Sequence, residues 1–333
     1  MKAIFLCEQS DKIFRVYDET ALFELRALTG IGTEVYRQAD ILADPARFAE
    51  VELIFSTWGM PPFSEREIAA CFPSLKCVFY AAGSVQGFAR PFLAAGVRVF
   101  SAWAANAVPV AEMTVSEIIL ANKGYYLTSR LFREQGFRAA RAAFGQIPGS
   151  YGETVGIIGA GMIGRLVIRM LKQYRLRVIV FDPFLSDEAA VELGVTKCSL
   201  PELFERSFTV SNHLANNKET EGMLDYDCFR RMREGAVFIN TGRGAQVVEG
   251  DLVRILRERP DLTALLDVTY PEPPDEGHPF YTLSNCLLTP HIAGSAGDEV
   301  ARMGEYMVDE CKAYLSSKAC RYEVSEAMLA TMA

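Results

Sequence analysis

The chain has 333 residues, half of them hydrophobic and 23% charged, so it can bury globular cores and has the length of two domains. Its formal net charge of −8 disfavours binding to nucleic acid through a broad basic surface. Eight scattered cysteines form no Cys-x-x-Cys pair and no apolar run approaches the roughly 20 residues that span a membrane, so we expect a cytoplasmic protein without metal or membrane partners.

The first hundred residues alternate short apolar runs with helical patterns. The runs at 3–6, 52–55, 77–81 and 97–100 have the length of buried strands. Between them, Ser64 and Glu67 have the spacing of a capping box, which predicts that a helix begins there. We therefore expect a sheet covered by helices.

A second series of apolar runs follows, at 155–158, 178–181, 208–211, 236–240, 263–266 and 286–288. Such continuous runs of Val, Ile, Leu and Phe are typical of parallel strands that are buried on both faces. The alternation with helical patterns predicts an α/β fold with two doubly wound parallel-sheet domains. The stretch 108–120 predicts a long helix between them, and 299–318 predicts a helix that returns to the first domain. We place the domains at 1–102 plus 297–333 and at 103–296.

A glycine-rich loop lies between the run 155–158 and a helical pattern. In the spacing Gly-x-Gly-x-x-Gly, Gly159 permits a tight turn, Gly161 lets the backbone approach a pyrophosphate, and Gly164 lets the helix pack on the strand. The helix N-terminus supplies positive charge that this acidic chain otherwise lacks. The loop predicts a dinucleotide site; the alternative is a glycine turn that packs without a ligand.

Asp182 ends the next predicted strand, about 20 residues after the loop, as in dinucleotide-binding motifs. A carboxylate there accepts hydrogen bonds from the ribose 2′-hydroxyl and repels a 2′-phosphate, which favours NAD over NADP. The alternative is a turn residue at the strand end, since Pro183 follows directly.

Candidates for acid–base chemistry are few, because the chain has only three histidines. Arg243, Glu272 and His291 each follow a predicted strand of the second series. The carboxyl ends of parallel strands meet at one edge of a sheet, where ligands bind, so we expect these side chains to lie near the glycine loop. Singly, each has a plain alternative: a surface arginine, a solvated glutamate and a satisfied core histidine.

In this order the motifs resemble those of the D-isomer-specific 2-hydroxyacid dehydrogenase family, across residues 77 to 296. The resemblance implies a Rossmann NAD-binding domain at 103–296 and a flavodoxin-like substrate domain at 1–102 plus 297–333. The matching stretches are Ala82-Gly83, Ala105-Asn106-Ala107 with Val110-Ala111-Glu112, the glycine loop with Asp182, Ile239 to Gly244, Asp267-Val268 with Glu272-Pro273, and Thr289 to Gly294.

The resemblance implies a role for each reactive side chain. His291 exchanges a proton with the substrate oxygen, because imidazole titrates near neutrality. Glu272 orients His291 and favours its protonated form. Arg243 grips the substrate carboxylate and polarises the carbonyl.

The family also implies which residues meet the cofactor. Asp267 is expected to hold the nicotinamide carboxamide, with a strand-end turn residue as the alternative. His213, Leu214 and Ala215 stand where the family has an adenine-side segment, with Ala215 in place of the usual proline; we interpret His213 as structural or adenine-lining. The expected cofactor-binding set is Gly159, Gly161, Met162, Ile163, Gly164, Asp182, His213, Leu214, Ala215, Thr241, Asp267 and Gly294.

Substrate contacts are expected mainly from the first domain. Backbone amides at Ala82, Gly83 and Ser84 are expected to meet the substrate carboxylate, and Asn106 to reach the substrate or nicotinamide, with a helix cap as its alternative. Trp58 is our candidate for a pocket wall, with a core or hinge tryptophan as the alternative, and Trp103 is the second candidate. These segments hold no Arg or Lys cluster, which argues against a phosphorylated acid.

The expected protein is an NAD-dependent D-2-hydroxyacid dehydrogenase that acts on a small 2-oxo or 2-hydroxy acid and forms a homodimer, with the 108–120 helix as interface or as buried core. His278 is interpreted as a surface-loop residue. The first alternative is an NAD-sensing corepressor of the same fold. The second is formate- or phosphite-type oxidation, against which Glu272 argues.

Overall fold

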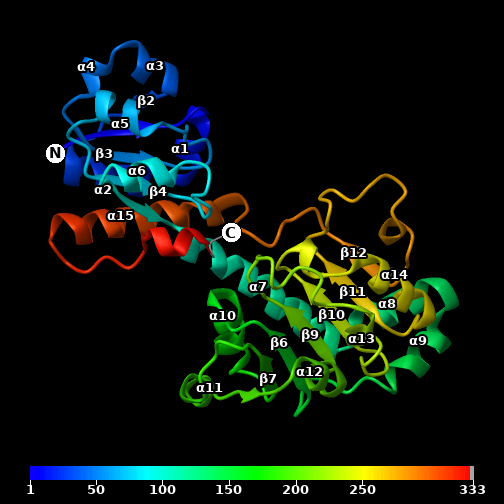
Figure 1. Ribbon diagram of the computed structural model, residues 1–333. Helices are drawn as coiled ribbons and strands as arrows, with labels where there is room; N and C mark the ends of the chain where they lie inside the picture. Colours follow the sequence, from blue (N-terminus) through cyan, green and yellow to red (C-terminus); the bar gives the residue numbers. More distant parts are fainter. Residues whose placement is uncertain (331–333) are drawn as a thin grey trace. The chain divides into compact units, whose positions relative to one another are not determined.

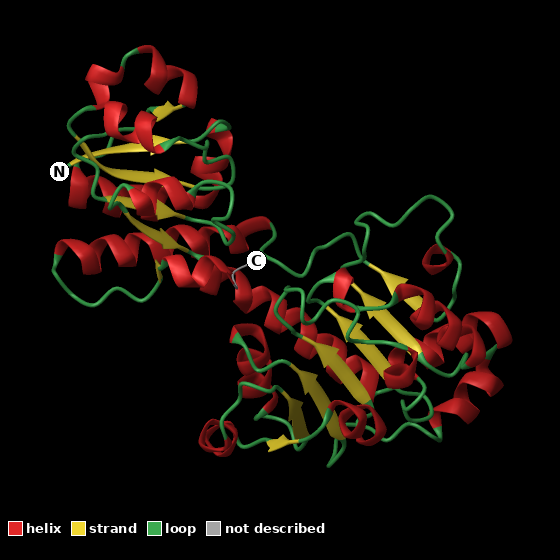
Figure 2. Ribbon diagram, viewed as in Figure 1, coloured by secondary structure: helices red, strands yellow, loops and turns green. Residues whose placement is uncertain are grey.

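The computed structural model describes residues 1–330 and divides into two compact units. Unit 1 comprises Met1–Asn106 and the chain from Ser295 onward, and unit 2 comprises Ala107–Gly294. Each unit contains one sheet covered by helices (Figures 1 and 2). Two parallel-sheet α/β units were expected, and the fold class is confirmed.

Unit 1 is built on a six-stranded sheet in the order β2-β1-β3-β4-β5-β13. The first five strands pair in parallel in the order 2-1-3-4-5 typical of flavodoxin-like folds, and β13 is antiparallel to β5. The strands are β1 Lys2–Leu6, β2 Val35–Tyr36, β3 Val51–Ser56, β4 Cys77–Tyr80, β5 Arg98–Ser101 and β13 Glu323–Val324. The helices are α1 Ser10–Val16, α2 Glu19–Thr29, α3 Gln38–Ala43, α4 Pro45–Phe48, α5 Glu65–Cys71, α6 Ala89–Ala94 and α15 Ala301–Leu315, with short turns η3 Gly297–Val300 and η4 Glu326–Ala330.

Aromatic side chains fill the core of unit 1. Phe55, Phe79 and Phe100 face one another in register on β3, β4 and β5. Their rings stack with centroids 5.0 and 4.9 Å apart. Ser64 and Glu67 form the expected capping box at the start of α5, which confirms that prediction. Because the strands are buried on both faces, only their ends can present side chains to a ligand.

Unit 2 contains a seven-stranded sheet in the order β8-β7-β6-β9-β10-β11-β12, with every pair parallel. This is the Rossmann order with one strand added at the end. The strands are β6 Thr154–Ile158, β7 Arg177–Phe181, β8 Thr196–Lys197, β9 Thr209–Asn212, β10 Val237–Asn240, β11 Thr263–Leu266 and β12 Cys286–Leu288. The helices are α8 Tyr125–Gln135, α9 Phe137–Phe144, α10 Met162–Leu171, α11 Asp187–Leu193, α12 Leu200–Arg206, α13 Tyr226–Phe229 and α14 Glu249–Glu258, with turns η1 Gly244–Gln246 and η2 Pro279–Tyr281.

The unit 2 sheet has an apolar core on each face. One core includes Ile118 of α7 and Val167 of α10, and the other includes Phe204 of α12 and Leu256 of α14. Helix α7, Trp103–Asn122, starts in unit 1 and continues through unit 2. Within residues 1–330, α7 is the one helix long and apolar enough to cross a membrane, but 56% of the window that meets this test is buried, as in a core helix. The helix is longer than the apolar run 108–120 that the sequence analysis singled out.

The ten expected strands are all present, with one informative shift. Strand β9 ends at Asn212, one residue later than expected, so Asn212 closes a buried strand instead of starting a loop. The two-residue strands β2, β8 and β13 carry too short a pattern to be seen in the sequence.

Candidate functional site

The glycine loop connects β6 to α10, and two of its three glycines leave no room for a side chain. Gly159 has a φ of +89°, and a Cβ on it would lie 2.7 Å from the carbonyl oxygen of His213. A Cβ on Gly164 would lie 2.1 Å from the Gly159 oxygen. A Cβ on Gly161, by contrast, would meet nothing within 4 Å. Two glycines therefore serve the fold, while Gly161 borders open space.

The N-terminus of α10 lies directly at that open space. Gly161 is its N-cap and provides no side-chain hydrogen bond to the first turn, which begins at Met162 and Ile163. Backbone N–H groups of the first turn and the helix dipole together favour an anion there. The loop and helix thus fit a dinucleotide pyrophosphate.

Asp182 follows β7 and is hydrogen-bonded to the glycine loop. Its Oδ2 accepts a hydrogen bond from the Ala160 amide at 2.6 Å, and its Oδ1 accepts one from the Phe184 amide at 2.8 Å. Each carboxylate oxygen can accept a second bond. The residue is half-buried, so one side remains accessible to a ribose hydroxyl.

His213 is buried at the end of β9, beside the glycine loop. Its amide donates to the Ile158 oxygen at 2.7 Å, and its Nε2 lies 3.0 Å from the Ser211 hydroxyl. Burial lowers the pKa of His213 to about 4, so the ring is neutral at neutral pH. Leu214 and Ala215 follow in a partly exposed loop.

Arg243 follows β10, at the start of η1. Its Nη1 donates to the Gly242 oxygen at 2.7 Å, and within the described part of its unit no carboxylate pairs with it. Gly244 packs on the chain after β11, because a Cβ there would lie 2.0 Å from the Thr269 carbonyl carbon. The Arg243 loop therefore sits against the segment that leads to Glu272.

Glu272 and His291 form a direct pair. His291 Nδ1 lies 2.7 Å from Glu272 Oε1, and the two side chains are 47% and 43% exposed. His291 adopts a left-handed backbone with a φ of 56°. Because Nδ1 is engaged by the carboxylate, Nε2 is the nitrogen left for another molecule.

Asp267 anchors the segment around His291 by hydrogen bonds. Its buried carboxylate accepts hydrogen bonds from the Thr289 hydroxyl at 2.6 Å and from the amides of Ile292 and Ala293 at 2.8 and 2.9 Å. A carboxylate has about four acceptor positions, so one remains for an external donor. The sequence did not reveal this anchoring role.

Thr241 and His278 have partners within unit 2 that the sequence did not reveal. The Thr241 hydroxyl lies 3.2 Å from that of Thr114 on α7 and is buried. His278, interpreted as a surface-loop residue, lies in a loop and is half-buried. Its Nε2 lies 3.6 Å from a Glu249 carboxylate oxygen, and its ring packs edge-on against Phe280. Gly294 is half-buried at the end of the unit.

Glu117 is a residue of unit 2 that sequence reasoning missed. It lies on α7, and one of its carboxylate oxygens is buried without a partner among the described residues. Burial, followed by the charge of Asp267, raises the pKa of Glu117 to about 7. Nothing in the local sequence pattern distinguishes it from the exposed Glu112 of the same helix.

In unit 1, the expected substrate residues lie at the carboxyl edge of its own sheet. Trp58 follows β3, is 37% exposed, and its carbonyl oxygen accepts from the Cys7 thiol at 3.3 Å. After β4, the Ala82 amide already donates to Tyr80, whereas Gly83 and Ser84 are more exposed.

Asn106 and Trp103 both have partners within unit 1. Asn106 Oδ1 accepts from the Ser295 amide at 2.9 Å. Trp103 packs edge-on against Tyr322, with ring centroids 5.9 Å apart, which favours a packing role over a pocket wall.

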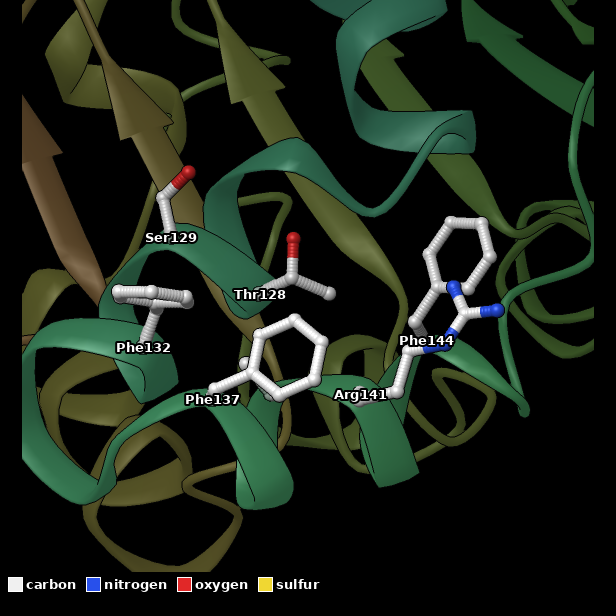
Figure 3. Close-up of a pocket in the computed structure, with 7 residues that line it drawn as sticks. Thr128, Ser129, Phe132, Phe137, Arg141 and Phe144 are labelled. Atoms are coloured by element: carbon white, nitrogen blue, oxygen red, sulfur yellow. The ribbon is translucent and has the colours of Figure 1, made fainter.

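A groove of about 260 Å³ lies on α8 and α9 (Figure 3). Phe132, Phe137 and Phe144 surround it together with Arg141. None of the residues predicted to bind cofactor or substrate lines it. The groove is therefore separate from the site assembled at the sheet edge.

Comparisons with known proteins concern the family and the fold. A family model described as the NAD binding domain of D-isomer specific 2-hydroxyacid dehydrogenases matches residues 115–293. A glyoxylate reductase of Korarchaeum cryptofilum is 35% identical over 164 residues, which are 49% of this chain and 49% of the relative. A D-3-phosphoglycerate dehydrogenase of Mycobacterium bovis is 27% identical over 255 residues, which cover 76% of this chain and 48% of the relative. The chain thus spans about half the length of the curated relatives it matches.

The fold is also shared with solved structures. The crystal structure of a phosphoglycerate oxidoreductase from Rhizobium etli superposes with a TM-score of 0.80 at 21% identity, covering 98% of this chain and 99% of that chain. At this identity the likeness concerns the fold alone.

Proposed function

Because the chain belongs to the D-isomer specific 2-hydroxyacid dehydrogenase family, we propose that it is an NAD(H)-dependent oxidoreductase that interconverts a D-2-hydroxy acid and its 2-oxo acid. One observation carries the proposal: His291 Nδ1 lies 2.7 Å from the Glu272 carboxylate, while Nε2 is left for a substrate. Arg243, which pairs with no carboxylate of its described unit, follows a strand of the same sheet. Acid–base and anion-binding groups thus accompany a dinucleotide loop.

The cofactor is proposed to lie on residues 103–296, with the pyrophosphate at the N-terminus of α10. Asp182 retains acceptor positions for a ribose 2′-hydroxyl and would repel a 2′-phosphate, so NAD is favoured over NADP. Leu214 and Ala215 are proposed to line the adenine side of the cofactor. Asp267 is proposed to accept a hydrogen bond from the nicotinamide carboxamide. When bound, NADH supplies the hydride for the substrate C2.

The proton of the reaction is assigned to His291. During reduction, Nε2 gives its proton to the substrate carbonyl oxygen; during oxidation, it takes the proton from the hydroxyl. Glu272 holds Nδ1 and so determines that Nε2 is the nitrogen that faces the substrate. Arg243 binds the substrate carboxylate through its guanidinium and polarises the neighbouring carbonyl.

Residues 1–102 plus 297–333 are proposed as the substrate domain. Amides near Gly83 and Ser84 are assigned to the substrate carboxylate, and Trp58 to the wall that selects the side chain. No Lys or Arg cluster accompanies these segments, so we favour an acid without a phosphate group.

We further propose a cytoplasmic homodimer. Eight free cysteines suit a reducing compartment. The contact is assigned to exposed aromatic side chains of α8 and α9, such as Phe132 at 54% and Phe137 at 66%, because the helix first considered, α7, is largely buried. Light scattering tests this by looking for twice the chain mass of 36.9 kDa.

The test of the activity is an absorbance assay of NADH consumption. The purified chain is mixed with glyoxylate, hydroxypyruvate, pyruvate, oxaloacetate, branched 2-oxo acids, phenylpyruvate or phosphohydroxypyruvate. We expect turnover of at least one unphosphorylated acid, a preference for NADH over NADPH of about 100-fold, and oxidation of the D- but not the L-hydroxy acid. NADH binding without turnover of any acid would contradict the proposal and favour an NAD-sensing binding protein.

A further inference from the structure

Three buried amide side chains, Asn212, Asn240 and Gln246, meet at the carboxyl edge of the unit 2 sheet. Their exposed fractions are 0%, 1% and 0%. Asn212 and Asn240 end the adjacent strands β9 and β10 and are partners in register. Asn212 Nδ2 donates to Asn240 Oδ1 at 3.0 Å and to Gln246 Oε1 at 2.6 Å. We name these three residues the amide cluster.

The amide cluster holds the main chain around Arg243 on both sides. Gln246 Oε1 accepts from the Arg243 amide at 3.3 Å, and Asn240 Nδ2 donates to the Arg243 carbonyl oxygen at 3.2 Å. Asn240 Oδ1 also accepts from the Gly242 amide at 3.1 Å. The backbone position from which the Arg243 side chain extends is therefore set by side chains of the cluster.

The same cluster holds the loop after β9. Gln246 Nε2 donates to the carbonyl oxygens of Leu214 and Ala215 at 2.9 and 3.0 Å. Asn212 Oδ1 accepts from the Leu214 amide at 3.2 Å. The loop in turn abuts the glycine loop, because a Cβ on Gly159 would lie 2.7 Å from the His213 oxygen. An unbroken series of contacts thus runs from the glycine loop to Arg243.

The orientation of each amide group is determined by backbone partners. Leu214 offers a donor to Asn212, while Leu214 and Ala215 offer acceptors to Gln246. Rotating any of the three amides by 180° would set donor against donor or acceptor against acceptor. Leaving a buried polar group unpaired costs free energy. The loop after β9 and the loop that carries Arg243 therefore cannot shift separately without breaking the cluster.

We propose that Gln246 is a positioning residue that couples cofactor binding to the placement of Arg243. A dinucleotide that settles on the glycine loop and on residues 213–215 orders these carbonyls. Through its hydrogen bonds, Gln246 then restrains the Arg243 backbone. The guanidinium is therefore positioned to bind the substrate carboxylate once the cofactor is bound. The inference rests on the proposed function, since it assumes that the cofactor contacts the loop after β9.

The first experiment uses NADH alone and needs no turnover. Hydrogen–deuterium exchange of backbone segment 241–246 is measured with and without NADH, in the wild type and in Gln246→Met, which keeps the side-chain length but removes both hydrogen-bonding atoms. We expect NADH to slow exchange about tenfold in the wild type and less than about twofold in the variant. Absence of protection in the wild type, or equal protection in a folded Gln246→Met, would overturn the proposal.

The second experiment measures coupling with oxamate, an unreactive 2-oxo acid mimic. In the wild type, NADH is expected to tighten oxamate binding about tenfold; in Gln246→Met this factor falls towards one, and the KM for the 2-oxo acid rises more than kcat falls. NADH affinity stays within about threefold of the wild type. An unchanged coupling factor in the variant would refute the inference while leaving the activity itself in place.

Two further variants separate positioning from plain destabilisation. Thr209→Val removes another buried side-chain bond of β9, from Thr209 to Asn122 at 2.7 Å, and is expected to keep the wild-type coupling. Gln246→Glu keeps the acceptor for the Arg243 amide, but its ionised carboxylate sets a second oxygen against the Leu214 and Ala215 carbonyls. Coupling is expected to be lost in this variant too, which provides a second test if Gln246→Met does not fold. Coupling lost equally in Thr209→Val would count against a specific role of Gln246. A wild type that binds NADH but turns over no acid would instead refute the proposed function, with the exchange experiment still decisive for the cluster.

Discussion

At the carboxyl edge of the unit 2 sheet, Arg243 and His291 stay available, whereas Thr57 and Ser101 at the corresponding edge of unit 1 are used internally. His291 meets Glu272 through one nitrogen only, and Arg243 has no carboxylate partner in its described unit. In unit 1, the Thr57 hydroxyl donates to the Ala81 oxygen at 2.7 Å, and the Ser101 hydroxyl donates to the oxygens of Ala82 and Gly83. The difference supports the proposal that unit 2 carries the chemistry and that unit 1 contributes shape.

The largest expected effect removes the acid–base group of unit 2. His291→Asn should lower kcat about 1000-fold, because no other group replaces the proton at Nε2, while NADH affinity stays nearly unchanged. Steady-state kinetics and a separate NADH titration measure both. His278→Asn is the matched control, since it too removes a histidine near a carboxylate, and it should cost less than about tenfold. Turnover by His291→Asn close to that of the wild type would show that the proton is handled elsewhere.

A second prediction concerns the buried histidine of the same edge, His213. Because burial lowers the pKa of His213 from 6.5 to about 4, the folded protein binds fewer protons than the unfolded chain between these values. The free energy of unfolding is therefore unaffected by His213 above pH 6.5. It falls by about 3 kcal/mol as the pH is lowered towards 4, because the unfolded chain takes up the proton first. Urea unfolding of the wild type and His213→Gln at pH 7, 6, 5 and 4 measures this; the variant should lose less stability on acidification.

The comparison of the two proteins decides that experiment. If His213→Gln and the wild type lost stability in parallel, the buried ring would not be the group that titrates.

The smallest effect tests the role assigned to unit 1. Trp58→Ala should change the ratio of kcat/KM between a large and a small 2-oxo acid about tenfold, because a partly exposed indole offers apolar contact to a substrate side chain. The kcat for the smallest acid should change little. Trp103→Phe, which alters a ring that packs on Tyr322, should keep the substrate ranking. An unchanged ranking in Trp58→Ala would remove the selective role from this edge.

The comparison also explains how much the sequence could predict. Arg243, Glu272 and His291 were proposed as site residues because each follows a buried apolar run, and the order of such runs places their ends at one edge. The two sheets and the α5 capping box were predicted for the same local reasons. These features depend on short stretches of chain.

The amide cluster was missed because it depends on contacts between distant segments. Asn212 and Asn240 are neutral and belong to separate strands, and only the pairing of β9 with β10 brings them into register. Gln246 joins them from the turn that follows Arg243. Two adjacent parallel strands that both end in Asn were the one available signal. The contact of His278 with Glu249 was missed for a similar reason, since Glu249 belongs to another element.

The three glycines of the segment 159–164 differ in what an added side chain would meet. Any side chain at Gly164 would collide with the main chain at 2.1 Å, and Gly159 needs a left-handed backbone, so changes there are removed because the chain no longer folds. At Gly161 a methyl group would meet no atom within 4 Å. A lineage that had lost its need for the dinucleotide could accept alanine there while remaining folded. Under the proposed function, Gly161→Ala therefore probes dinucleotide binding in a folded chain, whereas the same change at Gly159 or Gly164 probes folding.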